Sequence, residues 1–216
     1  MTFEEKVLRD RALANGENPD DPEVNARIKR ELAESQEEPE ESILSPNEVN
    51  ALYNEVVAIL TNLEGHIVKP EMYGNMSLLE MFANQATNLS LDLIAVDGYI
   101  QPEEAMALNA IFDLDFTVQD YVEFYQQRDK ETYLDVKFRM VFVPQAYYVA
   151  VAADRALFGG RDYFTVKVMR FFLELIKTVT TIDGQFDSTE NSAINLFSLA
   201  FKKVTPGDAQ GYVYVK

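Results

Sequence analysis

Apolar residues recur at helical spacing in segments that begin with recognisable N-caps. Ser45–Glu48 has Pro at the first helical position and Glu three residues after the Ser, which is a capping box, and it opens an apolar run to Leu63. Ser77–Glu80 is a second box and predicts a helix that runs to Val96. Thr117–Asp120 has a similar cap-like pattern and precedes a third helical run. We therefore predict three helices that start at these caps.

Three more helices are predicted in the last part of the chain. Pro144–Phe158 has helical spacing and ends at two consecutive glycines, Gly159 and Gly160. Asp162–Ile182 is apolar on nearly every face, which is typical of a helix surrounded by protein. A last helix is expected over Glu190–Lys203, before a Pro-Gly pair.

Strand-like alternation is rare in this chain. Only Lys137–Val143 and Gly211–Val215 have strand-like composition, and both segments are short. Asp129–Arg139 has no Gly or Pro hinge, so it either continues the preceding helix or bends away from it. The pattern as a whole predicts an all-α fold.

A repeat becomes visible when the chain is aligned with itself at an offset of 86 residues. Leu93–Glu104 then lies over Val179–Glu190, and the similarity continues into the following helix. Each copy has an apolar helix end, Asp-Gly, a bulky apolar residue, a cap and a new helix, which predicts two αα-hairpins. The matched pairs are Asp97 with Asp183, Gly98 with Gly184, Ile100 with Phe186, Glu104 with Glu190, Ala107 with Ala193 and Asn109 with Asn195.

The acidic residues of the two loops have two interpretations. They can cap the following helices, because the helix macrodipole favours negative charge at an N-terminus. They can also offer oxygen ligands to Ca²⁺ or another hard divalent cation. An EF-hand is excluded, because the residues two and four positions before each Asp are not ligands. The candidate metal ligands are Asp97, Glu103 and Glu104 in the first copy and Asp183, Asp187 and Glu190 in the second.

The duplicated pattern Ala/Thr-x-Asp-Gly-x-(Ile/Phe)-x-x-x-Glu resembles that of the TerB-like (tellurite-resistance) all-helical domains. That fold also occurs at the cytosolic end of a membrane-anchored J-domain cochaperone. The resemblance covers residues 46–203 and implies a multi-helix bundle with a role in stress response or protein assembly rather than catalysis. It also implies divalent-cation binding at Asp97, Glu104, Asp183 and Glu190. The chain departs from the family in its acidic arm, its Tyr/Phe-rich middle and its last residues.

Composition and charge exclude several classes of function. The 216 residues include 36 acidic and 19 basic side chains, for a net charge of −17, which disfavours nucleic acid as a partner. The absence of Cys excludes disulfide scaffolds and thiolate metal sites. A Ser–His–Asp triad would have to use His66, the only histidine, and no phosphate-binding glycine loop is present. We therefore expect a protein that is not an enzyme.

Charge and composition divide the chain into three parts. The first part, residues 1–45, has 13 acidic and 6 basic residues, and we predict a short helix in it that begins at Asp21 and Pro22. The longest uncharged apolar-rich run, between Arg139 and Asp154, is 14 residues long, which is shorter than the roughly 20 that a membrane span needs. No signal-peptide pattern is visible, so we expect a cytoplasmic protein. The predicted parts are an acidic arm over 1–45, a TerB-like helical domain over 46–203 and a tail over 204–216.

Three functional hypotheses follow. The first is a non-enzymatic, TerB-like interaction or scaffold module with a protein partner, in a stress-response or envelope-associated assembly. The second is a divalent-cation-binding protein that uses the loop acids. The third is an enzyme of unrecognised type, which would need a polar pocket with His66 and two carboxylates. The oligomeric state stays open.

Overall fold

The computed structural model consists of two units, residues 1–42 and residues 43–216, which are described separately. In the arm, Pro22 and residues 24–27 and 29 are helical, and the backbone N–H of Asn25 donates to Asp21 (2.8 Å). The short helix predicted after Asp21 is therefore confirmed. The residues that the structure describes are 18–19, 21–22, 24–27 and 29 in the arm and 43–68, 75–95, 99–127, 133–135, 140–182 and 188–215 in the second unit.

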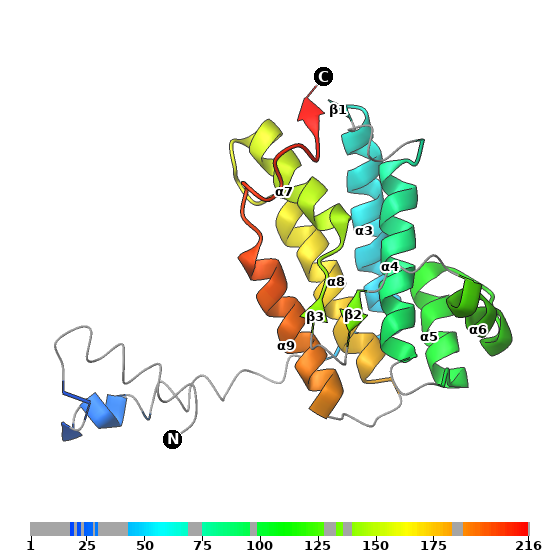
Figure 1. Ribbon diagram of the computed structural model, residues 1–216, viewed down its shortest axis with the longest axis horizontal. Helices are drawn as coiled ribbons and strands as arrows, with labels where there is room; N and C mark the ends of the chain where they lie inside the picture. The colour runs from blue at the N-terminus through cyan, green and yellow to red at the C-terminus, as the bar shows by residue number, and fades with distance from the viewer. Residues whose placement is uncertain are drawn as a thin grey trace. The chain divides into compact units, whose positions relative to one another are not determined.

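The second unit is built mainly of helices, which confirms the all-α prediction (Figure 1). Its described helices are α3 (Pro46–Glu64), α4 (Leu78–Ile94), α5 (Pro102–Phe112), α6 (Val118–Gln127), α7 (Gln145–Phe158), α8 (Phe164–Thr180) and α9 (Ser188–Lys203). Its strands are β1 (Ile67–Val68), β2 (Leu134–Asp135), β3 (Met140–Val141) and β4 (Tyr214–Val215). Ile67 pairs with Val215 in the antiparallel β1–β4 ladder, and Leu134 pairs with Val141 in the antiparallel β2–β3 ladder.

Three helices begin at the caps that the sequence predicts. In α3 the Glu48 carboxylate accepts hydrogen bonds from the Ser45 backbone N–H (2.8 Å) and hydroxyl (2.7 Å). Both bonds lower the pKa of Glu48, and the bond from the hydroxyl has the larger effect. Ser77 and Glu80 form the same box at α4. At α6 the backbone N–H of Thr117 donates to Asp120 (2.7 Å).

Helices α7 and α8 begin at side chains from elsewhere in the fold. The Gln85 side chain of α4 accepts the backbone N–H of Ala146 at the start of α7 (2.9 Å). The buried Asp154 carboxylate accepts the backbone N–H groups of Phe164 (2.9 Å) and Thr165 (2.8 Å) at the start of α8. The sequence analysis did not anticipate these caps, because their donors and acceptors are far apart in the chain or on different helices.

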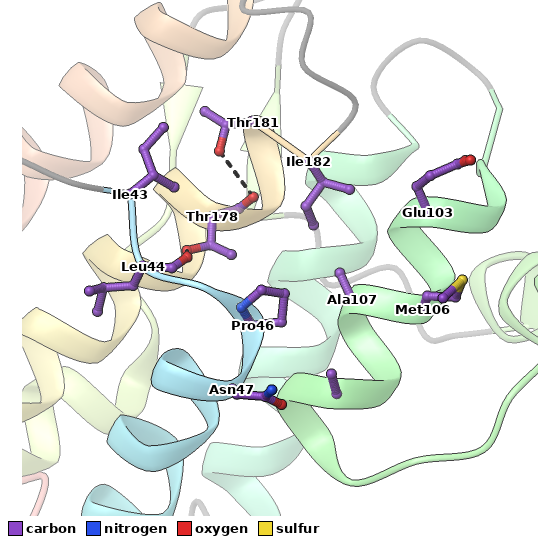
Figure 2. A pocket seen from close by; sticks show the side chains of 11 residues that line it. Ile43, Leu44, Pro46, Asn47, Glu103, Met106, Ala107, Thr178, Thr181 and Ile182 are labelled. Atoms are coloured by element: carbon purple, nitrogen blue, oxygen red, sulfur yellow. Dashed lines mark hydrogen bonds between the residues drawn. The ribbon is translucent and has the colours of Figure 1, made fainter.

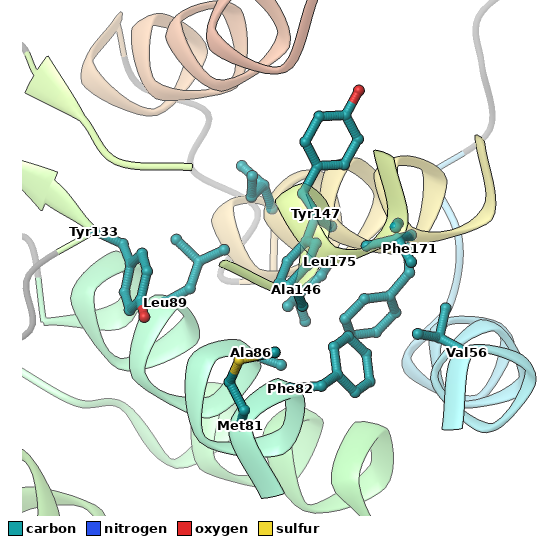
Figure 3. Packing of buried hydrophobic residues seen from close by; sticks show 14 of the residues in the cluster. Val56, Met81, Phe82, Ala86, Leu89, Tyr133, Ala146, Tyr147, Phe171 and Leu175 are labelled. Carbon is teal, nitrogen blue, oxygen red and sulfur yellow. The ribbon is translucent and has the colours of Figure 1, made fainter. Parts of the chain in front are cut away.

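Helix α8 lies at the centre of the second unit. It packs against α3, α4, α7 and α9, as expected for a helix that is apolar on most of its faces. Figure 3 shows Phe82 of α4 and Phe171 of α8 together in the core, and their ring centroids are 5.2 Å apart. Tyr53 of α3 stacks on Phe82 at 5.5 Å, so aromatic side chains join three helices. The first turns of α8 are less covered, since Val166 is exposed.

The repeat offset is preserved in the helix boundaries. Helices α4 and α8 start 86 residues apart, and so do α5 and α9. Eight pairs of positions that match at this offset are buried in both α4 and α8, so the two helices bury the same face. The buried pairs are Phe82 with Val168, Gln85 with Phe171, Ala86 with Phe172, Leu89 with Leu175, Ser90 with Ile176, Asp92 with Thr178, Leu93 with Val179 and Ile94 with Thr180.

Two segments outside the main helices also have defined places. Helix α6 ends at Gln127 and β2 begins at Leu134, so the helix does not continue through Leu134–Asp135; most of Asp129–Arg139 lies outside the described residues. The backbone N–H groups of Tyr133 and Leu134 donate to the buried carboxylate of Asp92. The predicted C-terminal tail over 204–216 packs onto the helical unit, since Ala209 and Val213 are buried and β4 pairs with β1. Among the described residues, no helix has the length and apolar character of a membrane span.

Candidate functional site

An open, mostly apolar groove lies where three separate segments of the second unit meet (Figure 2). The segment before α3 and the end of α8 form one side, and α5 forms the other. The groove has a volume of about 490 Å³, within the range of roughly 300–1,000 Å³ that is typical of ligand pockets. Its lining residues are Ile43, Leu44, Pro46, Asn47, Glu103, Met106, Ala107, Ala110, Thr178, Thr181 and Ile182.

The side of the groove before α3 is held by two sets of hydrogen bonds. The Thr178 hydroxyl of α8 donates to the backbone carbonyl of Leu44 (2.8 Å), which ties this segment to the end of α8. One residue later, Ser45 forms the capping box with Glu48. Ile43 nevertheless leaves 54% of its surface exposed beside the groove.

Helix α5 forms the opposite side with a large and two small residues. Met106 is 71% exposed, whereas Ala107 and Ala110 leave the space that makes the groove. The Asn50 amide of α3 donates to the carbonyl of Ile111 (2.9 Å) and to the Asp113 carboxylate (3.1 Å) at the end of α5. Helix α5 is thereby fixed to α3, which sets the position of this side of the groove.

The two described candidate metal ligands of the first repeat have different surroundings. Glu104 accepts the backbone N–H of Gln101 (2.7 Å) and so caps α5 as the third-position acid. Glu103 is exposed and lines the groove, where it is the single charged residue among the described lining residues. Adjacent residues of a helix point in different directions, and the structure accordingly gives these two acids separate roles.

The other candidate ligands are not described at side-chain level. Asp97, Asp183 and Asp187 lie outside the described residues, and Glu190 belongs to α9 but its side chain is not described. Where the structure does describe the chain, no group of three or more His, Asp or Glu side chains is placed to hold a metal ion. Metal binding by the loop acids therefore stays a prediction.

The helices that lead into the two Asp-Gly loops end at the same end of the unit. Leu78 at the start of α4 lies next to Glu64 at the end of α3, because its N–H donates to that carboxylate. Thr178 at the end of α8 lies next to the start of α3. Both α4 and α8 thus run antiparallel to α3, and Figure 1 shows their C-terminal ends on the same side.

The only histidine lies away from this groove. His66 follows the C-terminal end of α3, whereas the groove is built at the N-terminal end of that helix. The buried acids Asp92 and Asp154 both accept backbone N–H groups, and neither lines the groove. The described residues of this groove therefore do not include the arrangement that the enzyme hypothesis requires, which is His66 with two carboxylates in a polar pocket.

The groove itself was not predicted from the sequence, because its residues come from three segments more than 50 residues apart. The local signal was small: two alanines at helical spacing beside an exposed Met in α5. Comparisons of the chain with protein-family models, with curated proteins and with solved structures find no match. The TerB-like resemblance accordingly rests on the duplicated loops alone.

Proposed function

We propose that this chain is a non-enzymatic, TerB-like interaction module that holds an apolar segment of a partner protein in the groove between Ile43–Asn47, α5 and the end of α8. One observation carries the proposal: the groove is apolar and open, and its sides are fixed by hydrogen bonds within the unit. Exposed apolar patches with a polar rim are typical of protein interaction sites. The resemblance to TerB-like domains suggests a cytoplasmic stress-response or envelope-associated assembly as the setting.

The binding mode follows from the shape and the chemistry of the lining. A pre-formed apolar groove between helices suits the apolar face of a helix or an extended segment, which inserts a few anchor side chains. Met106 is a suitable contact residue, because its flexible, polarisable side chain adapts to different partner surfaces. Among the lining residues that the structure describes, no set of groups has the geometry of an acid–base pair or an activated nucleophile.

The test uses a photoreactive amino acid at the groove. Met106→p-benzoylphenylalanine, introduced into the full chain in its native host, should give a crosslinked partner on illumination. Met76→p-benzoylphenylalanine is the matched control, because Met76 is also exposed but precedes α4 at the opposite end of that helix from α5. The adduct should disappear when Ala110→Phe fills the groove. Equal adducts at both positions, or an adduct that is unaffected by Ala110→Phe, would contradict the proposal.

Divalent-cation binding is the second candidate function. The observation that favours it is the shared end at which α4 and α8 terminate, because both Asp-Gly loops follow these helices. We expect the melting temperature of the protein in Ca²⁺, Mg²⁺ or Zn²⁺ to be higher than its melting temperature in EDTA. At a hundredfold excess over the dissociation constant the gain is about 2.7 kcal/mol. Asp97→Ala/Asp183→Ala should abolish the gain; no gain in the wild type would reject the candidate.

A further inference from the structure

We infer that the segment that occupies the groove is cationic and amphipathic, with a large apolar side chain between Lys or Arg residues. This inference rests on the proposed function and adds the chemistry of the partner. It follows from the charges around the groove, taken together with its apolar lining.

The helices that form most of the groove have no basic residue. Residues 46–127, which include α3, α4, α5 and α6, contain 13 acidic residues and one basic residue, Lys69. Residues 128–216 contain 10 acidic and 12 basic residues. The groove thus lies mainly on the strongly negative half of the unit, and a cationic segment is attracted to it from a distance.

The charges close to the groove are mainly acidic. Glu103 lines it and is exposed, and Glu48 lies in the first turn of α3 next to Asn47. Lys177 precedes the lining residue Thr178, but its ammonium group is paired with Glu174 on α8 (3.4 Å). A partner Lys or Arg at the mouth therefore meets Glu103, and none of the described lining residues is a competing cation.

The apolar lining requires more than charge from the ligand. Ile43, Met106 and Ile182 offer apolar surface that only an apolar side chain can cover favourably. A segment with basic residues alone would leave this surface in water. The combination of an apolar lining with the exposed acidic residue Glu103 matches an amphipathic segment that alternates aliphatic or aromatic anchors with Lys or Arg.

Other occupants fit the charges less well. A second copy of the chain would bring a net charge of −17 to an already negative surface. Charge complementarity thus selects a different, basic partner segment.

The experiment measures binding of three labelled 14-residue peptides to the full chain by fluorescence anisotropy. The first peptide is an amphipathic Leu/Lys sequence, the second replaces every Leu by Ala, and the third replaces every Lys by Glu. We expect the Leu/Lys peptide to bind at least tenfold more tightly than either of the others. Equal binding of the Ala/Lys peptide would mean charge attraction alone, and equal binding of the Leu/Glu peptide would remove the role of charge; either result overturns the inference.

Two pairs of protein variants locate the binding. Ala110→Phe fills the groove and should weaken the Leu/Lys peptide tenfold or more, whereas Ala58→Phe adds the same side chain at an exposed position of α3 and should not. Glu103→Lys should weaken binding about fivefold, and Glu123→Lys on α6, with the same change of net charge, less than about twofold. Equal effects within either pair would overturn the inference. Circular dichroism and thermal melts establish that each variant is folded.

A different result distinguishes failure of the inference from failure of the proposed function. If Met106→p-benzoylphenylalanine captures a groove-dependent partner that has no basic segment, the interaction module stands and the cationic partner is wrong. If sedimentation shows a wild-type dimer that Ala110→Phe dissociates, the occupant is a second copy and the inference is also wrong.

Discussion

Helices α3, α4 and α5 begin at caps supplied by adjacent residues, whereas α7 and α8 begin at side chains supplied by other helices. Ser45, Ser77 and Gln101 each form a box with a Glu three residues later. Gln85 and Asp154 instead reach α7 and α8 from positions 61 and 10 residues away. A local cap can form as soon as its helix forms, but a distant cap requires that the fold is already assembled. The starts of α7 and α8 thus depend more on tertiary structure than the starts of α3, α4 and α5 do.

The same contrast appears at one matched position of the repeat. Asp92 in α4 and Thr178 in α8 are 86 residues apart, and both are buried. Asp92 accepts backbone N–H groups at β2, before α7, while Thr178 donates to the Leu44 carbonyl, before α3. Helix α4 therefore holds the segment that leads into α7, and helix α8 holds the segment that leads into α3. The two helices share this arrangement, but the side chain of α4 is the hydrogen-bond acceptor and the side chain of α8 is the donor.

The largest effect is expected from removal of the distant cap of α8. Asp154→Ala leaves the N–H groups of Phe164 and Thr165 without their acceptor, which should lower the free energy of unfolding by about 3 kcal/mol. Ser77→Ala, which removes the local cap of α4, should cost about 1 kcal/mol. Urea denaturation of both variants measures the difference. If the two variants lose the same stability, the contrast between local and distant caps has no energetic meaning.

The matched position should give the next largest effect. Asp92→Ala removes the acceptor of two backbone N–H groups and should cost about 2 kcal/mol, while Thr178→Val removes a single donor and should cost about 1 kcal/mol. Hydrogen exchange adds a local readout. The amides of Tyr133 and Leu134 should lose protection in Asp92→Ala and keep it in Thr178→Val. Protection that survives in Asp92→Ala would show that β2 is held by other contacts.

The smallest effect is expected in α6, which also begins at a local cap. Burial raises the pKa of Tyr121 to about 12, and its hydroxyl donates to Asn109 of α5 (2.8 Å). The ordinary pKa is about 10, so the unfolded chain loses this proton first, and the stability from neutral Tyr121 is present below pH 10 and is lost between pH 10 and 12. Tyr121→Phe should therefore lose less stability than the wild type as the pH rises from 10 to 12.

Tyr125→Phe is the control for this titration, because Tyr125 lies on the same helix and is exposed. Urea midpoints at several pH values should show wild-type behaviour for this variant. A Tyr121→Phe variant that follows the wild-type pH curve would mean that the alkaline loss comes from other groups, such as Tyr53 and Tyr147, whose pKa values burial also raises.

Local patterns explain why much of the fold was predicted from the sequence. Capping boxes, the glycines after α7 and the apolar faces of α4 and α8 are signals within a few residues, and the structure confirms them. Gly159 and Gly160 have φ values of 63° and 87°, a conformation that favours glycine and ends α7. The direction of the segment after α6 was left open, because Asp92 that binds it lies 41 residues earlier.

The site was predicted less well for a physical reason. Of the six acids proposed as ligands, Glu104 caps α5 and Glu103 lines a groove, and a sequence pattern alone does not distinguish these roles. The groove depends on where the end of α8 meets α3 and α5, which is determined by packing of the aromatic core. Asn50 and Thr178, which fix its sides, carry no motif that marks them.

The central position of α8 has a consequence for how the chain is made. Helix α3 packs on α8 although the two helices are separated by about 100 residues, and α4 packs on both α7 and α8. During synthesis on the ribosome, the apolar faces of α3 and α4 therefore emerge long before the helix that covers them. The nascent chain exposes these faces until α8 has left the exit tunnel, and in that interval it is open to chaperone binding and to misassembly.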